Sequence, residues 1–259
     1  MSSTATGFIL ETRDLAKEFK GFVAVNGVDL RVRRNTIHAL IGPNGAGKTT
    51  VFNLLTRFLS PTRGTIHFNG ADITTQRPDL IARRGMVRSF QISAVFPHLT
   101  VLENVRIALQ REQQDSYTFW RSASTLRKLD ARAQALLERV DLGGFEDRVA
   151  VDLPYGRKRA LELATTLAMD PQLLLLDEPT SGMGHEDVGR VTDLIRKVAA
   201  DRTVLMVEHN LRMVADLSDT ITVLQRGSVL AEGSYDEVSK DPRVLEAYVG
   251  PDDMNDAHH

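Results

Sequence analysis

The sequence Gly42–Thr49, GPNGAGKT, decides the fold class of this 259-residue chain. A short apolar run, TIHALI at Thr36–Ile41, precedes it, and apolar residues at helical spacing follow it over Thr49–Leu59. The apolar run predicts a buried strand, and the later spacing predicts a helix. A strand, a glycine-rich loop and a helix in this order are typical of nucleotide-binding α/β domains.

The loop has the P-loop (Walker A) spacing G-x-x-x-x-G-K-T, in which each residue type suits a bound phosphate. Its glycines let the backbone turn tightly, so that N–H groups converge on phosphate oxygens. Lys48 supplies a positive charge for the β- and γ-phosphates, and the Thr49 hydroxyl suits Mg²⁺. The helix that starts here adds its positive N-terminal end. We therefore expect ATP and Mg²⁺ as cofactors, with nucleotide contacts from Asn44, Gly45, Ala46, Gly47, Lys48, Thr49 and Thr50.

A second apolar run, LLLLD at Leu173–Asp177, is continuous rather than alternating and predicts a central parallel strand. It ends in the acidic pair Asp177-Glu178, at the place where a P-loop enzyme carries its Walker B acid. Asp177 is expected to hold Mg²⁺ mostly through water, because this ion keeps part of its hydration shell. Glu178 is expected to polarise the attacking water. Many strands end in acids at the solvent edge, so this interpretation depends on the P-loop.

Further apolar segments extend the same α/β core. Thr203–Val207 is predicted as a buried strand after a helical stretch at Val188–Ala200. Ile221–Leu224 and Val229–Ala231 are predicted as an antiparallel hairpin. Between the two parts of the core, Ile92–Leu163 carries apolar residues at helical spacing, which predicts an inserted helical subdomain.

Composition excludes several classes of protein. A net charge of −2 lacks the basic character of nucleic-acid-binding domains, so no nucleic acid is expected as a partner. The absence of cysteine excludes disulfides and thiolate metal sites. No apolar run approaches the roughly 20 residues that span a bilayer, and no signal peptide is visible. We expect a cytoplasmic protein without a membrane span.

Other motifs follow the order of one family. Gln91 follows Val87-Arg88-Ser89-Phe90, and Leu153–Arg157 (LPYGR) precedes a helix predicted at Ala160–Met169. Ser181–His185 follows the acidic pair, and His209 lies just after the strand TVLMV. With Phe19 and Phe22 upstream of the P-loop, this pattern resembles the ABC transporter ATPases from Phe8 to about Gly250.

The resemblance implies a fold and a division of the chain. The fold is an α/β P-loop NTPase (RecA-like) core with an antiparallel β subdomain and the inserted helical subdomain. The expected single ABC ATPase domain is 1–250, with core segments 8–91 and 164–235, a helical subdomain at 92–163, a C-terminal helix at 236–250, and a polar tail at 251–259.

The resemblance also implies roles for residues. Phe19 is similar to the aromatic residue that stacks on adenine, with Phe22 as the alternative. Gln91 is similar to the glutamine that contacts Mg²⁺ and the water and that links the site to a membrane permease. His209 is similar to the switch histidine on the γ-phosphate, although it could also be a surface histidine at a strand end. The implied catalytic residues are Glu178, His209 and Gln91, and the implied metal ligands are Thr49, Gln91 and Asp177.

The signature segment is implied to contact the nucleotide of a second ATPase subunit in a head-to-tail dimer, through Leu153, Pro154, Tyr155 and Gly156. The common motif is L-S-G-G-Q, and Pro154 removes a hydroxyl and a backbone donor that could reach the γ-phosphate. The loop Ser181–His185 after the acidic pair carries no acid or amide, where the family usually has one near Gly184. Both changes affect the half of the site that this chain would lend to its partner.

A finer resemblance is to the ATPase subunits of branched-chain amino-acid importers. It rests on the L-x-Y-G signature, on Arg88–Gln91, on Leu99–Val105 and on Leu245–Gly250 (LEAYVG). It implies ATP hydrolysis that drives amino-acid import through permease subunits at the inner face of the membrane, coupled through Gln91–Thr100. Alternatives are urea or amide importers, lipid or glycan exporters, a soluble ABC ATPase in DNA repair or translation, and a regulatory module that binds nucleotide without hydrolysis.

Overall fold

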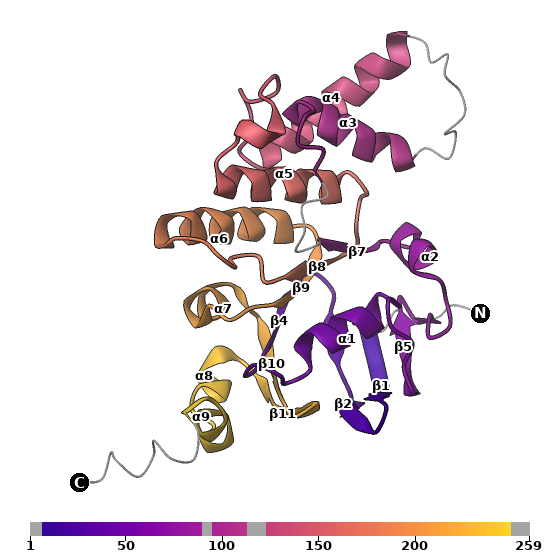
Figure 1. Cartoon of the computed structure of the whole chain (residues 1–259), viewed down its shortest axis with the longest axis vertical. Helices are drawn as coiled ribbons and strands as arrows, with labels where there is room; N and C mark the ends of the chain where they lie inside the picture. The colour runs from indigo at the N-terminus through magenta and orange to yellow at the C-terminus, as the bar shows by residue number, and fades with distance from the viewer. Residues whose placement is uncertain (1–6, 90–94, 113–122, 250–259) are drawn as a thin grey trace.

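The computed structural model describes residues 7–89, 95–112 and 123–249. Its largest sheet has the strand order β11-β10-β4-β9-β8-β7 (Figure 1). These strands are β4 (Ile37–Ile41), β7 (Met86–Ser89), β8 (Leu173–Asp177), β9 (Thr203–Val207), β10 (Thr220–Gln225) and β11 (Ser228–Gly233). Neighbours from β10 to β7 pair in parallel, and β11 pairs with β10 in antiparallel. Every residue of β4, β8 and β9 is buried, as expected for central parallel strands.

A second sheet is antiparallel, as predicted for the β subdomain. It has the order β2-β1-β5-β6, with β3 paired to β1. These strands are β1 (Phe8–Phe19), β2 (Phe22–Val28), β3 (Arg31–Arg33), β5 (Arg63–Phe68) and β6 (Ala71–Asp72). A buried cluster that includes Leu10, Phe52, Phe68 and Leu205 joins this sheet to α1 (Lys48–Leu55) and to the central sheet.

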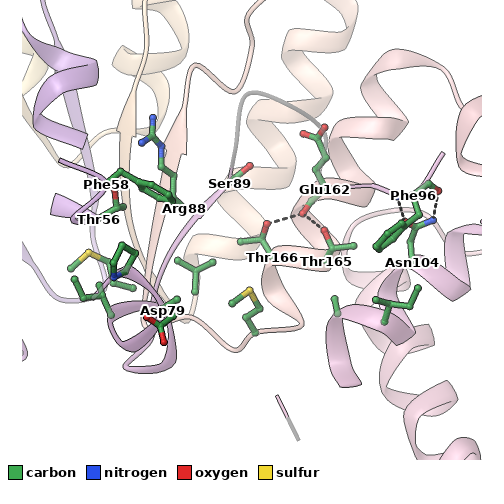
Figure 2. Close-up of a pocket in the computed structure, with 18 residues that line it drawn as sticks. Thr56, Phe58, Asp79, Arg88, Ser89, Phe96, Asn104, Glu162, Thr165 and Thr166 are labelled. Carbon is green, nitrogen blue, oxygen red and sulfur yellow. Dashed lines mark hydrogen bonds between the residues drawn. The ribbon is translucent and has the colours of Figure 1, made fainter. Parts of the chain in front are cut away.

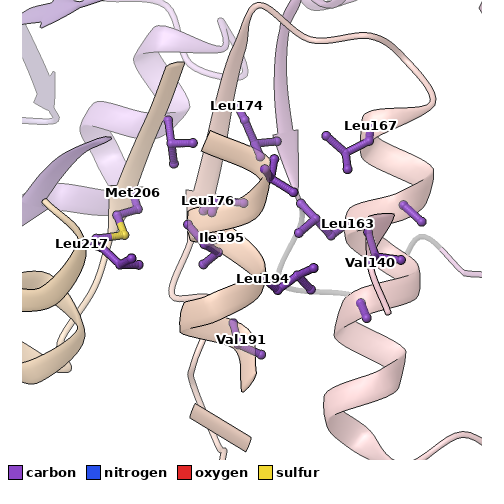
Figure 3. Close-up of a cluster of buried hydrophobic side chains, with 14 of the residues drawn as sticks. Val140, Leu163, Leu167, Leu174, Leu176, Val191, Leu194, Ile195, Met206 and Leu217 are labelled. Carbon is purple, nitrogen blue, oxygen red and sulfur yellow. The ribbon is translucent and has the colours of Figure 1, made fainter. Parts of the chain in front are cut away.

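Helices α5 (Tyr155–Leu167), α6 (His185–Ala199) and α7 (Leu211–Leu217) lie on the side of the central sheet away from α1 (Figure 1). Leu163 on α5, Leu176 on β8 and Ile195 on α6 share one buried cluster (Figure 3). Beyond α5 lie α3 (Val101–Glu112) and α4 (Ala123–Arg139), which form the helical region predicted between the two parts of the core. Two short helices complete the structure: η1 (Ala150–Asp152) precedes α5, and α2 (Pro78–Arg83) buries Ile81 in the same cluster as Phe52 of α1.

Helix boundaries differ from the sequence predictions at several places. Helix α1 ends at Leu55 rather than Leu59, because Arg57 adopts a left-handed backbone with φ of 60°. Helix α5 begins at Tyr155, five residues before the predicted start, with Pro154 as its N-cap. The predicted C-terminal helix at 236–250 is two helices, α8 (Tyr235–Val238) and α9 (Pro242–Val249). Pro242 lacks an N–H and disfavours a helical residue before it, which separates them.

In residues 7–89, 95–112 and 123–249, no helix combines the length and the apolar character that a membrane crossing requires.

Candidate functional site

The P-loop, the Walker B acids and His209 gather where three neighbouring parallel strands end. The P-loop follows β4, Asp177 closes β8, and His209 comes two residues after β9. The registers Leu40↔Val207 and Asp177↔Val207 align these ends. The carboxyl edge of a parallel sheet is where open α/β folds bind ligands.

Two glycines fix the shape of the P-loop. Gly42 has φ of 147°, and a Cβ there would lie 2.1 Å from the backbone oxygen of Leu224. Gly47 has φ of 99°, and a Cβ there would lie 2.6 Å from the backbone oxygen of Ala24. No side chain fits at either position without a backbone shift, so the loop is held tightly against β2 and β10.

Lys48 lies beneath the loop that it belongs to. Its ammonium group donates to the backbone oxygens of Gly42 at 2.7 Å and Pro43 at 3.0 Å, and the residue is only 6% exposed. Burial lowers the pKa of Lys48, and the nearby Glu178 carboxylate partly opposes that shift. Lys48 and the Walker B glutamate, Glu178, are therefore close enough for their charges to interact.

The other predicted phosphate contacts differ in exposure. Asn44, Gly45 and Thr49 are exposed, Gly47 and Thr50 are half-buried, and Ala46 is buried. A cavity of about 330 Å³ opens beside Asn44 and Gly45 and is also lined by Glu246 of α9. The loop thus presents its backbone to solvent in the way that phosphate binding requires.

Asp177 has a partner that sequence analysis did not anticipate. Its carboxylate is hydrogen-bonded by the guanidinium of Arg88, on the adjacent strand β7. Arg88 also donates to the Asn53 side chain at 2.6 Å, and its guanidinium lies 5.6 Å from the centroid of the Phe52 ring. The side chains of Arg88 and Asp177 are 9% and 3% exposed. No local sequence signal indicates this pair, because the two residues are 89 positions apart.

The oxygen donors predicted for Mg²⁺ are compatible with that ion. Arg88 contacts one carboxylate oxygen of Asp177, which leaves the other for a water or a metal. In the described part of the chain, the exposed Thr49 hydroxyl takes part in no hydrogen bond. One hydroxyl and one carboxylate suit Mg²⁺, which keeps several waters and binds nucleotide phosphates.

Glu178 and His209 meet directly. His209 Nε2 lies 2.8 Å from Glu178 Oε1, and both side chains are partly exposed. Glu178 has a left-handed backbone with φ of 47°, and its N–H donates to the Val207 oxygen at 2.9 Å. This backbone contact turns the glutamate side chain toward the histidine. The structure therefore unites Lys48, Asp177, Glu178 and His209 at one edge.

The structure does not bring the signature segment to this edge. Leu153 is buried, and Pro154 caps α5 on the opposite side of the sheet from α1 (Figure 1). The Tyr155 hydroxyl donates to the Ser181 oxygen at 3.1 Å. A Cβ on Gly156 would lie 2.9 Å from an Asp187 oxygen, so the segment packs against the start of α6.

The two adenine candidates face each other across a hairpin. Phe19 at the end of β1 pairs with Phe22 at the start of β2, and they are 42% and 68% exposed. Ala24, two residues after Phe22, lies against the P-loop at Gly47. The choice between the rings stays open. Gln91, the remaining predicted residue, lies outside the described residues.

Comparison with known proteins agrees with this geometry. Residues 25–181 match the family described as ABC transporter, and residues 228–250 match the family described as branched-chain amino acid ATP-binding cassette transporter. The high-affinity branched-chain amino acid transport ATP-binding protein BraF of Pseudomonas aeruginosa is 39% identical, over 93% of this chain and 98% of its own. The corresponding protein LivG of Escherichia coli K12 is 37% identical over the same shares.

A crystal structure of an ATP-binding cassette of an ABC transporter, in its ADP conformation, superposes with a TM-score of 0.84. That chain is 30% identical, and the match covers 95% of this chain and all of the other. A nucleotide-free cassette gives a TM-score of 0.82 at 30% identity, covering 94% and 99%. The P-loop, the contact between Glu178 and His209, and the relatives all indicate the same family. The chain belongs to the ABC transporter family, as an ATP-binding subunit that hydrolyses ATP.

Proposed function

We propose that this chain powers the import of branched-chain or other hydrophobic amino acids. The contact between Glu178 and His209, beside Lys48, is the observation that carries the enzymatic part, because it assembles a base and a polar partner at a phosphate cradle. The curated relatives are named for branched-chain amino acid transport, and the match at 228–250 supports that cargo.

The site residues divide phosphate binding, metal binding and proton transfer among them in this proposal. The backbone N–H groups of Asn44–Thr50 bind the phosphates, and Lys48 leaves its carbonyl partners to meet their charge. Thr49 and Asp177, with Gln91, would hold Mg²⁺, which would supply positive charge against the negative charge that develops on the phosphates. Glu178 accepts the proton of the attacking water, and His209 orients Glu178 and contacts the γ-phosphate.

The separation of the signature segment from the P-loop supports a dimer. Leu153–Gly156 lies across the sheet from the P-loop, so it would serve a nucleotide bound by a second ATPase subunit, this chain or a homologue. Pro154 lacks an N–H, but the N–H groups at the start of α5 remain for a phosphate. We infer a head-to-tail dimer in which the site completed by this segment is the weaker one.

A groove beside Asp177 is suited to binding a helix of a permease. A cavity of about 490 Å³ opens between α2, β7, α3 and α5 and is lined mainly by apolar atoms (Figure 2). Phe58 and Phe96 line it and are 55% and 51% exposed. The buried Asn104 side chain holds the backbone of Phe96 by two hydrogen bonds, at 2.7 and 3.1 Å. Arg88 lines the same groove, so the groove and Asp177 share a residue.

We infer that a cytoplasmic helix of a transmembrane permease binds in this groove. The chain would then lie at the inner face of the cell membrane, held there by its partner. Apolar grooves with a few placed polar groups are the usual receptor for an amphipathic helix.

The nucleotide part of the proposal is tested with Lys48→Ala. Loss of the only side-chain cation in the loop should sharply weaken MgATP binding, measured by calorimetry, while the fold is kept. Lys240→Ala, which removes an exposed lysine outside the P-loop, is the control and should bind MgATP normally. Near wild-type affinity in Lys48→Ala would remove the assignment. ATP-driven leucine uptake by the assembled transporter, with urea as the alternative solute, tests the cargo.

A further inference from the structure

Glu208 is a buried carboxylate between the two halves of the catalytic edge. It lies between β9 and His209 and is only 2% exposed. One of its oxygens, Oε2, accepts from the N–H groups of His209 at 2.7 Å and Asn210 at 2.9 Å. The other, Oε1, accepts from the N–H of Thr180 at 2.9 Å and from the Thr180 hydroxyl. Each oxygen therefore binds a different segment of the chain.

These donors account for a buried charge. Among the described residues, no lysine, arginine or histidine forms an ion pair with Glu208. A buried carboxylate is costly unless its oxygens are hydrogen-bonded, and four donors to one carboxylate meet that need. The arrangement requires a carboxylate, because an amide or a hydroxyl in the place of Glu208 could not accept hydrogen bonds from all four donors.

The contacts close a ring around the catalytic pair. Glu178 and Thr180 belong to the segment after β8, and Glu208 and His209 to the segment after β9. Glu208 ties Thr180 to the backbone of His209, and the His209 ring meets Glu178 at 2.8 Å. A shift of either segment would break at least one member of this ring.

We propose that Glu208 is a positioning residue that holds His209 on Glu178 during ATP hydrolysis. It acts by fixing the backbone from which the histidine side chain extends. The inference rests on the roles proposed above for Glu178 and His209. Replacing the partners that orient metal ligands changes affinity or activity by about 10–100-fold, and we expect a change of that order for a partner that orients His209.

The test begins with Glu208→Gln. The four hydrogen bonds to Glu208 are called the brace below. Whichever way the new amide turns, its NH₂ group faces at least one backbone N–H from which it cannot accept, so part of the brace is lost. We expect kcat for ATP to fall by about 10–100-fold while ATP affinity is unchanged. In a His209→Ala background the same change should have little further effect on kcat, because residues that act as a unit are not additive.

Thr180 provides a pair of variants that keeps Glu208 intact. Thr180→Val removes the hydroxyl donor and should lower kcat, whereas Thr180→Ser keeps the donor and should retain it. Urea unfolding shows whether Glu208→Gln folds. If it does not, the kcat values of the two Thr180 variants test the proposal instead. A purely structural role would change stability without separating kcat from ATP affinity.

The outcomes are distinct. Wild-type kcat in both Glu208→Gln and Thr180→Val overturns the brace, as does a loss that adds fully to that of His209→Ala. Wild-type kcat in His209→Ala alone overturns the proposed role of His209, and this inference with it. A fall in His209→Ala without any fall in the Glu208 and Thr180 variants leaves the proposed function standing and overturns only the brace.

Discussion

The ion pair between Arg88 and Asp177 gives a prediction of stability. Both side chains are almost fully buried, at 9% and 3% exposed. Arg88→Met would therefore leave the Asp177 carboxylate in the interior without an opposite charge. Methionine fills the volume of the arginine stem, and the guanidinium contact with Asn53 is lost as well. Breaking a buried pair by removing one partner costs about 3–5 kcal/mol. We expect a loss of that size in the free energy of unfolding.

Urea unfolding without nucleotide or Mg²⁺ measures this loss. Arg190→Met is the matched control, because the same substitution there breaks a pair whose side chains are 68% and 86% exposed. Exposed pairs contribute about 0–1 kcal/mol, so the control should remain near wild type. Adding Asp177→Asn to Arg88→Met should recover part of the loss, since no charge then stays buried alone. A loss in Arg88→Met no larger than that of Arg190→Met would refute the reasoning.

Three further results are expected. Phe19→Ala should weaken ATP binding by roughly 1–3 kcal/mol through lost base stacking, and a loss seen instead in Phe22→Ala would transfer that role. Phe96→Asp should detach the chain from its permease in co-purification and spare basal ATPase, whereas Leu211→Asp on α7 should keep both the association and the ATPase; retained association of the Phe96 variant would place the docking surface elsewhere. Burial lowers the pKa of His38 to about 4, so stability should fall by about 3 kcal/mol as pH falls from about 6.5 to 4, because only the unfolded chain takes up that proton. His38→Gln should remove that part of the pH dependence, and an unchanged slope would contradict it.

The strands of the catalytic edge were predictable because they are buried on both faces. LLLLD and TVLMV are unbroken apolar runs, and the structure places β8 and β9 at the predicted bounds. The P-loop was equally readable, since Gly42 and Gly47 each occupy a backbone that other residues avoid. The strands and the P-loop each depend on a requirement within a short stretch of sequence, so the sequence pattern predicts them.

The features that sequence analysis missed depend on contacts between distant residues. Arg88 and Asp177 are 89 positions apart, and Thr180 and Glu208 are 28 apart, so no local spacing announces either pair. The early start of α5 was missed because its first turn, from Tyr155, is polar and carries no apolar periodicity. Phe19 and Phe22 could not be separated because the hairpin sets them opposite each other.

The ATPase rate of Glu178→Gln, measured beside its affinity for MgATP, tests the central claim most directly. Glutamine keeps the size of the side chain and a hydrogen bond to His209 but cannot accept a proton from water. General-base assistance is worth roughly 10²–10⁴-fold, so turnover should fall by about that factor while MgATP still binds. The bound state should then accumulate as an ATP-dependent dimer, alone or with the partner ATPase, in size-exclusion chromatography. Hydrolysis at the wild-type rate would contradict the role of Glu178 and the catalytic edge built around it.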